Sequence, residues 1–406
     1  INYSFFSDMS DWNPAEIIGN NPNVLDYSLY HKIIMKNAWH IGRAKIGYQK
    51  NIDHPLMTKF GNKPYVDIRA SFYSLIPNNI KKKYKIKLMK FYCNKLLDSP
   101  YLHDKVEFEI LFTCFDYKMK NRLNELLKNN FTKNEIKEIE ENLIEFTNNI
   151  INEFPEIKNN CEKSIKKMKI KREEIVKKSS QISHSKQIED IKKLLDDCKN
   201  LGTIPFSSMA RIAFIASILL KSLQKKGEIS NEFIEMFMNS IKTPLSEFQK
   251  DLVLLQSQKI TKNKFLKKYG HLRPGTYDIL SLRYDQRPAF ISENISKSRK
   301  DDDTVNFEFS DDQCCKIDNL LKCHGFTVAP DQLLNYIKNA IQGREYSKFV
   351  FSHSISDALE IIANWGAEMG LSRDELSFLD IRDILDAEVT AEGISLEHNL
   401  MNKSKN

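Results

Sequence analysis

The sequence predicts a mainly α-helical protein with a minor β component, organised as a multi-helical domain with a long helical hairpin. Apolar residues recur at helical spacing through residues 132–200, a stretch rich in Lys, Glu, Ile, Asn and Leu. Partial alternation of apolar and polar residues with a period of two occurs in Pro64–Phe72 and Lys105–Phe115, where we expect short strands. These observations predict many helices and little sheet.

The two expected strands carry charged side chains. Successive strand residues point to opposite faces, so Asp67 and Arg69 would share one face of the first strand. In the second, Glu107 and Glu109 alternate with apolar residues, although the continuation Leu111–Phe112 suits a buried helix equally well.

Residues 132–200 are typical of a helical hairpin or stalk. Pro155 is expected to interrupt it, because proline removes a helix hydrogen bond. The serine-rich segment Lys177–Lys186 lacks a strong apolar face and is expected to form the turn.

Further helices follow, and the first four have plausible caps at Ser207, Ser230, Thr243 and Thr261. A polar segment, 292–310, is expected to be a mobile linker. The expected helices are Ser208–Lys226, Ser230–Ile241, Pro244–Gln258, Thr261–Tyr269, Asp311–Lys322, Pro330–Phe351, Ser356–Met369 and Arg373–Asp386. The chain therefore divides into a motif-bearing α/β segment, the hairpin, a helical segment, the linker and a C-terminal helical segment, at 1–131, 132–200, 201–291, 292–310 and 311–406.

Composition narrows the function classes. With 41% hydrophobic and 28% charged residues, the chain is in the globular range, and no apolar run approaches the roughly 18 residues of a membrane span. The net charge of +7 comes mainly from dispersed lysines that are not interleaved with aromatic residues, so nucleic-acid binding is not predicted. Seven scattered cysteines without CxxC or zinc-like spacing predict reduced thiols, a cytoplasmic protein and no metal site.

Three clusters concentrate polar, aromatic, Gly and Pro residues. The first cluster, Phe6–Glu16, contains Asp8, Asp11 and Asn13; as an alternative, Asp11 or Asn13 only caps a helix at Pro14. The second cluster joins Tyr65–Phe72 to His103–Glu109. Its arginine, Arg69, suits a carboxylate or phosphate, and Asp67 or Glu107 suits an ammonium group; an internal ion-pair network is the alternative.

The third cluster is the loop Tyr269–Asp285, which gives the strongest indication of a site. Gly and Pro residues favour a fixed, exposed loop, and His, Arg, Tyr and Asp side chains supply an acid or base, an anion ligand and hydrogen-bonding groups. The alternative is a structural loop closed by an Arg–Asp bridge. The candidate site residues of the third cluster are His271, Arg273, Tyr277, Asp278 and Arg283.

The clusters include DWNPAEIIG from Asp11, PYVDIRASF from Pro64, LHDKVEFEI from Leu102 and YGHLRPGTYDILSLRYD from Tyr269. These stretches resemble the central region of phosphoenolpyruvate-synthase-like phosphotransferases. The last resembles the GHRGPGE-type loop of the rifampin phosphotransferase branch, in which His271, Arg273 and Gly275 align. Tyr277 and Asp278 depart from that branch, which argues against rifampin as acceptor. The chain more closely resembles the L-glutamine kinase branch of capsular phosphoramidate biosynthesis.

The resemblance implies an acceptor-binding region that works with an ATP-grasp domain and a swivelling phosphohistidine domain of the same polypeptide. ATP and Mg²⁺ would be bound by a domain absent from this chain, which begins with Ile1, shows no glycine-rich phosphate loop, and is expected to be inactive alone. The motif TxGGxxSHxA is also missing; His353 is expected near a helix cap.

The resemblance also implies residue roles. The proton acceptor would be His271, Asp278 or Glu107. The substrate-binding residues would be Arg69, Arg273, Tyr277, Arg283, Asp8, Asp11, Asn13, Asp67, Glu109 and His103, so convergence of the three clusters in space is a structural prediction. Alternatives are a family member that acts on pyruvate or a secondary metabolite, or a noncatalytic helical scaffold.

Overall fold

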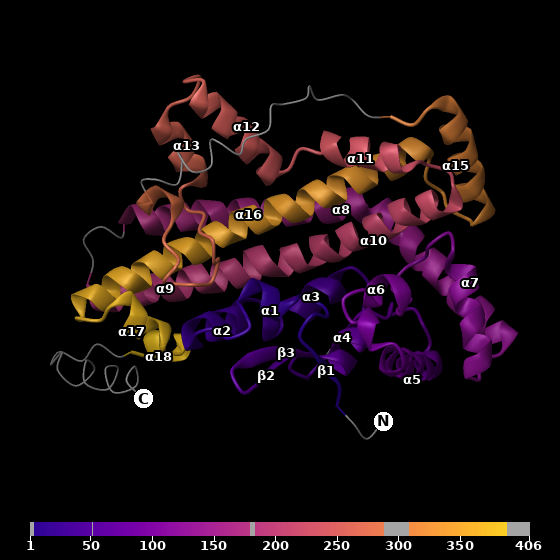
Figure 1. The fold of residues 1–406 in the computed structure, drawn as a ribbon, viewed down its shortest axis with the longest axis horizontal. Coiled ribbons are helices and arrows are strands. Elements are labelled where there is room, and N and C mark those ends of the chain that lie inside the picture. Colours follow the sequence, from indigo (N-terminus) through magenta and orange to yellow (C-terminus); the bar gives the residue numbers. More distant parts are fainter. Residues whose placement is uncertain (1–3, 51, 179–182, 288–307, 388–406) are drawn as a thin grey trace.

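The computed structural model describes residues 4–50, 52–178, 183–287 and 308–387. It is 70% helical with 4% strand, which confirms a mainly α protein with a minor β component. Two long helices, α10 (Ile204–Lys226) and α16 (Pro330–Glu368), pack side by side through the middle of the molecule (Figure 1). The indigo N-terminal elements lie along one side of this pair (Figure 1).

The described strands form one small antiparallel sheet with β3 (Lys63–Asp67) between β1 (Phe6–Ser7) and β2 (Met57–Phe60). Phe6 pairs with Asp67, and Met57 pairs with Val66. The first expected strand is only half right. The chain turns into α4 (Ile68–Ser74) at Asp67, whose carboxylate accepts hydrogen bonds from the backbone N–H groups of Arg69 and Ala70. Asp67 and Arg69 therefore do not share a strand face.

The second expected strand is wrong, because Val106–Glu109 forms the short helix α6. Val106 and Ile110 lie about one helical turn apart, and both are buried. The segment therefore folds as a helix, which places both side chains in the core. The other N-terminal elements are α1 (Pro14–Ile17), α2 (Val24–Tyr30), the π-helix η1 (His31–Met35), α3 (Ala38–Lys45), α5 (Lys82–Asp98), α7 (Met119–Leu123) and the 3₁₀ helices η2 (Pro100–Leu102) and η3 (Asn124–Asn129).

The expected interruption at Pro155 is also wrong. Helix α8 (Lys133–Lys178) runs through Pro155 for 46 residues, with its neighbours Ile151 and Phe154 buried. Helix α9 (His184–Asp197) follows beyond a gap at 179–182 and contacts α8. Both helices pack against α16, so this segment belongs to the core and is not a projecting stalk.

Two expectations for the long helices are corrected. Helix α10 begins at Ile204, after the π-helix η5 (Cys198–Thr203), and the Ser207 hydroxyl donates to the carbonyl of Trp39 instead of capping it. Helix α16 continues for 39 residues without the expected break between Phe351 and Ser356, so His353 lies inside the helix.

The caps at Ser230, Thr243 and Thr261 are confirmed: each side chain accepts a hydrogen bond from a backbone N–H of the first turn. The expected C-terminal helix divides at Phe378–Asp380. The expected linker, 292–310, lies mostly outside the described residues. The remaining helices are α11 (Asn231–Ser240), α12 (Pro244–Gln256), α13 (Lys262–Tyr269), the 3₁₀ turn η6 (Tyr284–Gln286), α15 (Asp311–Cys323), α17 (Arg373–Ser377) and α18 (Ile381–Leu385).

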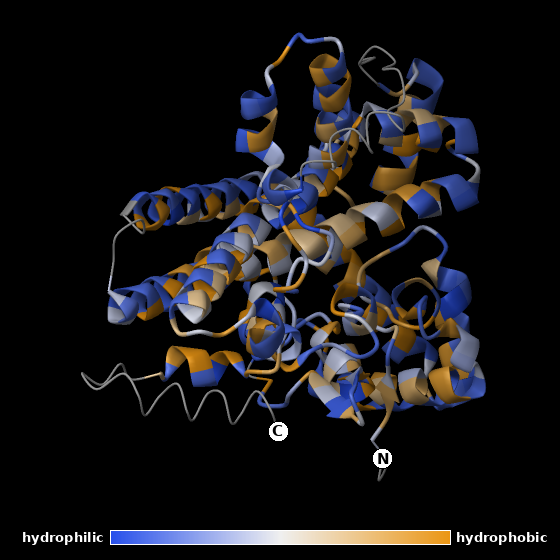
Figure 2. Cartoon of the chain, turned by 60° about the vertical axis from the view of Figure 1, so that its left-hand side comes forward, coloured by the Kyte–Doolittle hydropathy of each residue, from blue (hydrophilic) through white to orange (hydrophobic). Residues whose placement is uncertain are grey.

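Two large apolar cores hold the helices together. Each draws on the segments 1–131, 132–200 and 311–406, which therefore pack into a common structure. Hydrophobic and hydrophilic residues alternate along the long helices, as amphipathic packing requires (Figure 2). One helical stretch, His184–Lys226, has an 18-residue window apolar enough to span a membrane, but 83% of that window is buried inside the structure, as in a core helix.

Candidate functional site

The first two clusters meet at a cavity of about 340 Å³ beside α10 and α16. A volume of this size accommodates a small metabolite. Four candidate residues from the sequence line it: Asp11, Asn13, His103 and Glu107. Its other charged lining residues are Arg43, Asp104, Arg211, Arg344, Glu345 and Lys348.

Asp11 is held by a buried, bidentate ion pair with Arg43. Arg43 Nη2 lies 2.5 Å from Asp11 Oδ1, and Nη1 lies 2.9 Å from Oδ2. The Ser71 hydroxyl also donates to Oδ2, at 2.7 Å. Burial raises the pKa of the Asp11 carboxyl, but the Arg43 guanidinium outweighs it, and the pKa is lowered from its ordinary value. Asp11 is therefore an ionised support of the cavity wall, because its oxygens are already occupied.

The backbone of this wall is strained. Asp11, Trp12 and Asn13 all adopt positive φ angles, of 31°, 57° and 34°. Side-chain-bearing residues adopt this region rarely and at a cost, so the ion pair to Asp11 fixes a conformation that the chain would otherwise leave. Asn13 precedes α1, but its side chain does not cap that helix, so capping alone does not explain this cluster.

Arg211 is the most buried of the cationic side chains that line the cavity. Its side chain is 2% exposed, and its Nη1 donates to the Glu107 carboxylate. Burial lowers the pKa of the Arg211 guanidinium, but the Glu107 carboxylate outweighs this and raises the pKa, so the charge is retained. Within the described chain, Arg211 Nε and Nη2 have no hydrogen-bond partner. A buried guanidinium with two free donors is suited to an anionic oxygen.

Helix α16 supplies the remaining basic groups. Arg344 pairs with the neighbouring Glu345, whereas exposed Lys348 has no ion-pair partner among the described residues. Cationic and carboxylate side chains thus both line the cavity, a composition that matches a zwitterion better than a simple anion.

The other candidates of these clusters lie away from the cavity lining. Asp8 pairs with Lys63, and this hydrogen bond lowers the pKa of the Asp8 carboxyl. Asp67 caps α4 and lies 3.0 Å from His54 Nε2. Arg69 donates to the Ser4 hydroxyl at 2.9 Å, and Glu109 lies 3.9 Å from Lys225 Nζ. Unlike these four, His103 does line the cavity, and its Nδ1 lies 3.4 Å from the Ser7 hydroxyl.

The third cluster does not line this cavity, so the predicted convergence of all three clusters is wrong. Arg273 Nη2 lies 2.8 Å from Glu360, and Arg283 Nη1 lies 2.9 Å from Asp357, both on α16. Arg283 also bridges to Asp285 at 3.2 Å, which matches the structural-loop alternative.

The rest of the loop is held by local contacts. Tyr277 packs edge-on against Tyr30, with ring centroids 5.0 Å apart. The Asp278 carboxylate accepts from the backbone N–H of Leu280 at 2.8 Å. These contacts fix the loop on the protein, and no residue of Tyr269–Asp285 lines the cavity.

His271, in the third cluster, is stacked on His353 of α16. It is 2% exposed, and its two ring nitrogens have no hydrogen-bond partner in the described chain. Burial, with a smaller contribution from His353, lowers the pKa of His271 to about 2. Burial and the nearby Arg172 lower the pKa of His353 to about 2 as well. Both imidazoles are neutral near pH 7, and a group with this pKa is a weak proton acceptor.

Sequence reasoning missed four basic cavity residues, Arg43, Arg211, Arg344 and Lys348. One signal was available for Arg211, which stands alone as a charge at the start of the apolar run to Leu220 and is buried there. Arg43, Arg344 and Lys348 lie among many surface cations, and nothing local distinguishes them. Among the described residues, no group of three or more His, Cys, Asp or Glu side chains is placed to hold a metal ion.

Comparison with known proteins adds no relative: no protein-family model matches this chain, and no curated protein matches its sequence.

Proposed function

We propose that this chain is the acceptor-binding region of an ATP-dependent phosphotransferase, and that its acceptor is L-glutamine. The observation that carries the proposal is the cavity between the first two clusters, where Arg211 has free donors beside the Glu107 carboxylate. The motifs that line it are among those that resemble phosphoenolpyruvate-synthase-like phosphotransferases.

The charges of the cavity support an amino-acid ligand. An α-carboxylate would accept hydrogen bonds from the free donors of Arg211, and the ammonium group would bind Glu107. The volume of about 340 Å³ suits a ligand of this size and is small for a macrocyclic antibiotic. Asp11 and Arg43 would support the wall without contacting the ligand, since they satisfy one another.

In the proposed reaction, a phosphohistidine transfers its phosphoryl group to the glutamine amide nitrogen. The phosphorus–nitrogen bond to the histidine breaks, a new one forms to the amide nitrogen, and an amide proton passes to a base. Of the three candidate bases, His271 and Asp278 lie outside the cavity lining; Glu107 lines it, but in this proposal it binds the ammonium group, so the amide proton passes to another base. The proposal assigns ATP, Mg²⁺ and the carrier histidine to other domains of the same polypeptide.

The proposal includes a cytoplasmic location, where such a kinase would meet ATP and glutamine. All seven cysteines are free, and four of them are buried. Free thiols are typical of a reducing compartment, which supports this part of the proposal.

Calorimetric titration of the chain with L-glutamine tests the proposal, with L-glutamate, pyruvate and rifampicin as competitors for the same site. Glutamine alone is expected to bind. Glu107→Gln keeps the side-chain volume and removes the charge, so it should weaken binding by about tenfold or more. Glu109→Gln is the matched control, because Glu109 lies on the same helix, is 44% exposed and does not line the cavity.

Thermal melting of both variants checks that they fold. Glutamine binding of equal strength in the two variants would place the ligand elsewhere. Preferential binding of pyruvate or rifampicin would contradict glutamine as the acceptor.

A further inference from the structure

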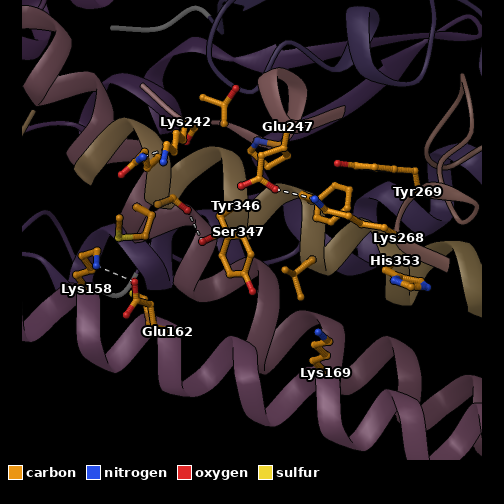
Figure 3. A pocket seen from close by; sticks show the side chains of 18 of the residues that line it. Lys158, Glu162, Lys169, Lys242, Glu247, Lys268, Tyr269, Tyr346, Ser347 and His353 are labelled. Atoms are coloured by element: carbon orange, nitrogen blue, oxygen red, sulfur yellow. Dashed lines mark hydrogen bonds and ion pairs between the residues drawn. The ribbon is translucent and has the colours of Figure 1, made fainter. Parts of the chain in front are cut away.

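A second and larger cavity, of about 580 Å³, lies on another face of α16 (Figure 3). Its walls come from α8, α16, α13 and the segment that joins α11 to α12. Neither the first nor the second cluster lines it. The proposed acceptor site therefore does not account for this cavity.

The cavity is strongly basic. Six cationic and three carboxylate side chains line it. Lys158 is paired with Glu162 at 2.9 Å, and Lys268 with Glu247 at 3.0 Å. Three other lysines, Lys169, Lys242 and Lys267, have no ion-pair partner among the described residues, and all three are exposed.

The three unpaired lysines belong to different walls. Lys169 extends from α8, and Lys242 and Lys267 come from the opposite side, around the start of α12 and on α13 (Figure 3 shows Lys169 and Lys242). Uncompensated cations around one cavity raise the local concentration of anions. A ligand with several anionic oxygens could contact more than one of them at once.

The cavity also contains a planar aromatic surface. Tyr346 lies between the basic walls in Figure 3, and 48% of it is exposed although it belongs to the central helix. An exposed ring among lysines is suited to stack against a flat heterocycle. Nearby, Asn339 and Gln342 donate through their amide nitrogens to Asn335 and to the Lys242 carbonyl, which orients their amide oxygens as acceptors.

We propose that this cavity binds a nucleoside polyphosphate, with its base on Tyr346 and its phosphates on Lys169, Lys242 and Lys267. A phosphate chain accounts for the three unpaired cations, and a base accounts for the exposed ring and the amide acceptors. The volume of about 580 Å³ is in the range of nucleotide-sized ligands. The inference does not depend on the identity of the acceptor.

The test is calorimetric titration of the full 406-residue chain with ATP, inorganic tripolyphosphate and adenosine, at low and high salt. ATP is expected to bind, and more weakly at high salt because exposed lysines are screened. Tripolyphosphate should bind about tenfold more weakly than ATP, because it lacks the stacking base.

Exposed residues can be changed with little risk to the fold. Lys169→Ala and Lys267→Ala should each weaken ATP binding by about three- to tenfold, whereas Lys166→Ala and Lys264→Ala, on the same helices but outside the cavity, should not. Tyr346→Ala should remove the advantage of ATP over tripolyphosphate, and Tyr346→Phe should keep it.

Three results would overturn the proposal. The first is no binding of ATP, and the second is equal loss in the cavity and control lysine variants. The third is tripolyphosphate binding as tight as ATP binding, which would reduce the cavity to a general anion site.

Discussion

The imidazole rings of His271 and His353 stack face to face, with centroids 3.7 Å apart and an angle of 8° between their planes. One ring comes from the third cluster and the other from α16, so the contact fastens the loop to the central helix. Two protonated rings at this distance would repel one another, and burial already disfavours the charge. The contact therefore depends on both rings being neutral.

The first prediction concerns the stability of the protein at acidic pH. The pKa of each histidine is about 2 in the folded chain, compared with an ordinary value of 6.5, so the unfolded chain binds more protons between these values. The free energy of unfolding should therefore fall as pH drops below about 6.5, by up to about 1.4 kcal/mol per pH unit for each histidine.

Urea unfolding of the native chain and of His353→Phe, from neutral pH to pH near 5, measures this slope. Phenylalanine keeps a stacked ring but cannot be protonated, so the variant should lose less stability in acid. Parallel pH profiles would contradict a pair of rings that is neutral in the folded chain.

The second prediction concerns Asp26, whose contribution to the free energy of unfolding changes with pH in the opposite direction. Burial, together with the charge of Asp278, raises the pKa of the Asp26 carboxyl to about 7. The folded chain then binds more protons than the unfolded chain between the ordinary pKa of 3.8 and about 7, so this contribution is lost as pH rises through 7.

Asp26→Asn removes the charge and keeps the shape, so it should stabilise the protein by about 1 kcal/mol more at pH near 8 than at pH near 6. The free energy of unfolding at the two values provides the comparison. Asp278→Asn serves as a second variant, because removing the charge of Asp278 should remove part of the destabilisation caused by ionised Asp26. A pH-independent effect of Asp26→Asn would refute this account.

The third prediction concerns the ion pair of Glu107 with Arg211. Glu107→Ala leaves the 2%-exposed Arg211 side chain without its counterion, so it should cost about 3–5 kcal/mol of unfolding free energy. The double variant Glu107→Leu with Arg211→Met removes both charges and should recover most of that loss. Failure of the double variant to recover stability would show that the pair is not the source of the cost.

The fourth prediction concerns the contact between α3 and α10 at Gly42. A Cβ at this position would lie 2.5 Å from the Ile204 carbonyl oxygen, a backbone atom that cannot move aside. Gly42→Ala should therefore destabilise the protein by about 1–3 kcal/mol. In Gly343→Ala the added carbon meets the far end of the flexible Met209 side chain, so the loss of stability in thermal melting should be smaller.

The helical content was predictable because apolar spacing and capping residues are local signals. Ser230, Thr243 and Thr261 cap helices as their sequence positions predict. The errors occur where burial in the tertiary structure determines the local backbone conformation. Pro155 is tolerated inside α8, and 105–115 forms a short helix and loop because Val106 and Ile110 are buried together.

Part of the candidate site was also predictable. The first two clusters are site candidates by their polar composition, and residues of both line one cavity, but Arg43 and Arg344 join it from helices outside these clusters. The third cluster was misplaced because local sequence does not reveal long-range partners. Its arginines, Arg273 and Arg283, are neutralised by acidic residues on α16, more than 70 residues away.

The continuity of α16 has a mechanical consequence. Arg344 and Lys348 face the smaller cavity, and Tyr346 and Val350 face the larger one, within two turns of the same helix. Because α16 is unbroken here, these two pairs of side chains are held in a fixed relation to one another. The two cavities thus have one helix as a common wall, and a ligand in either of them would contact it.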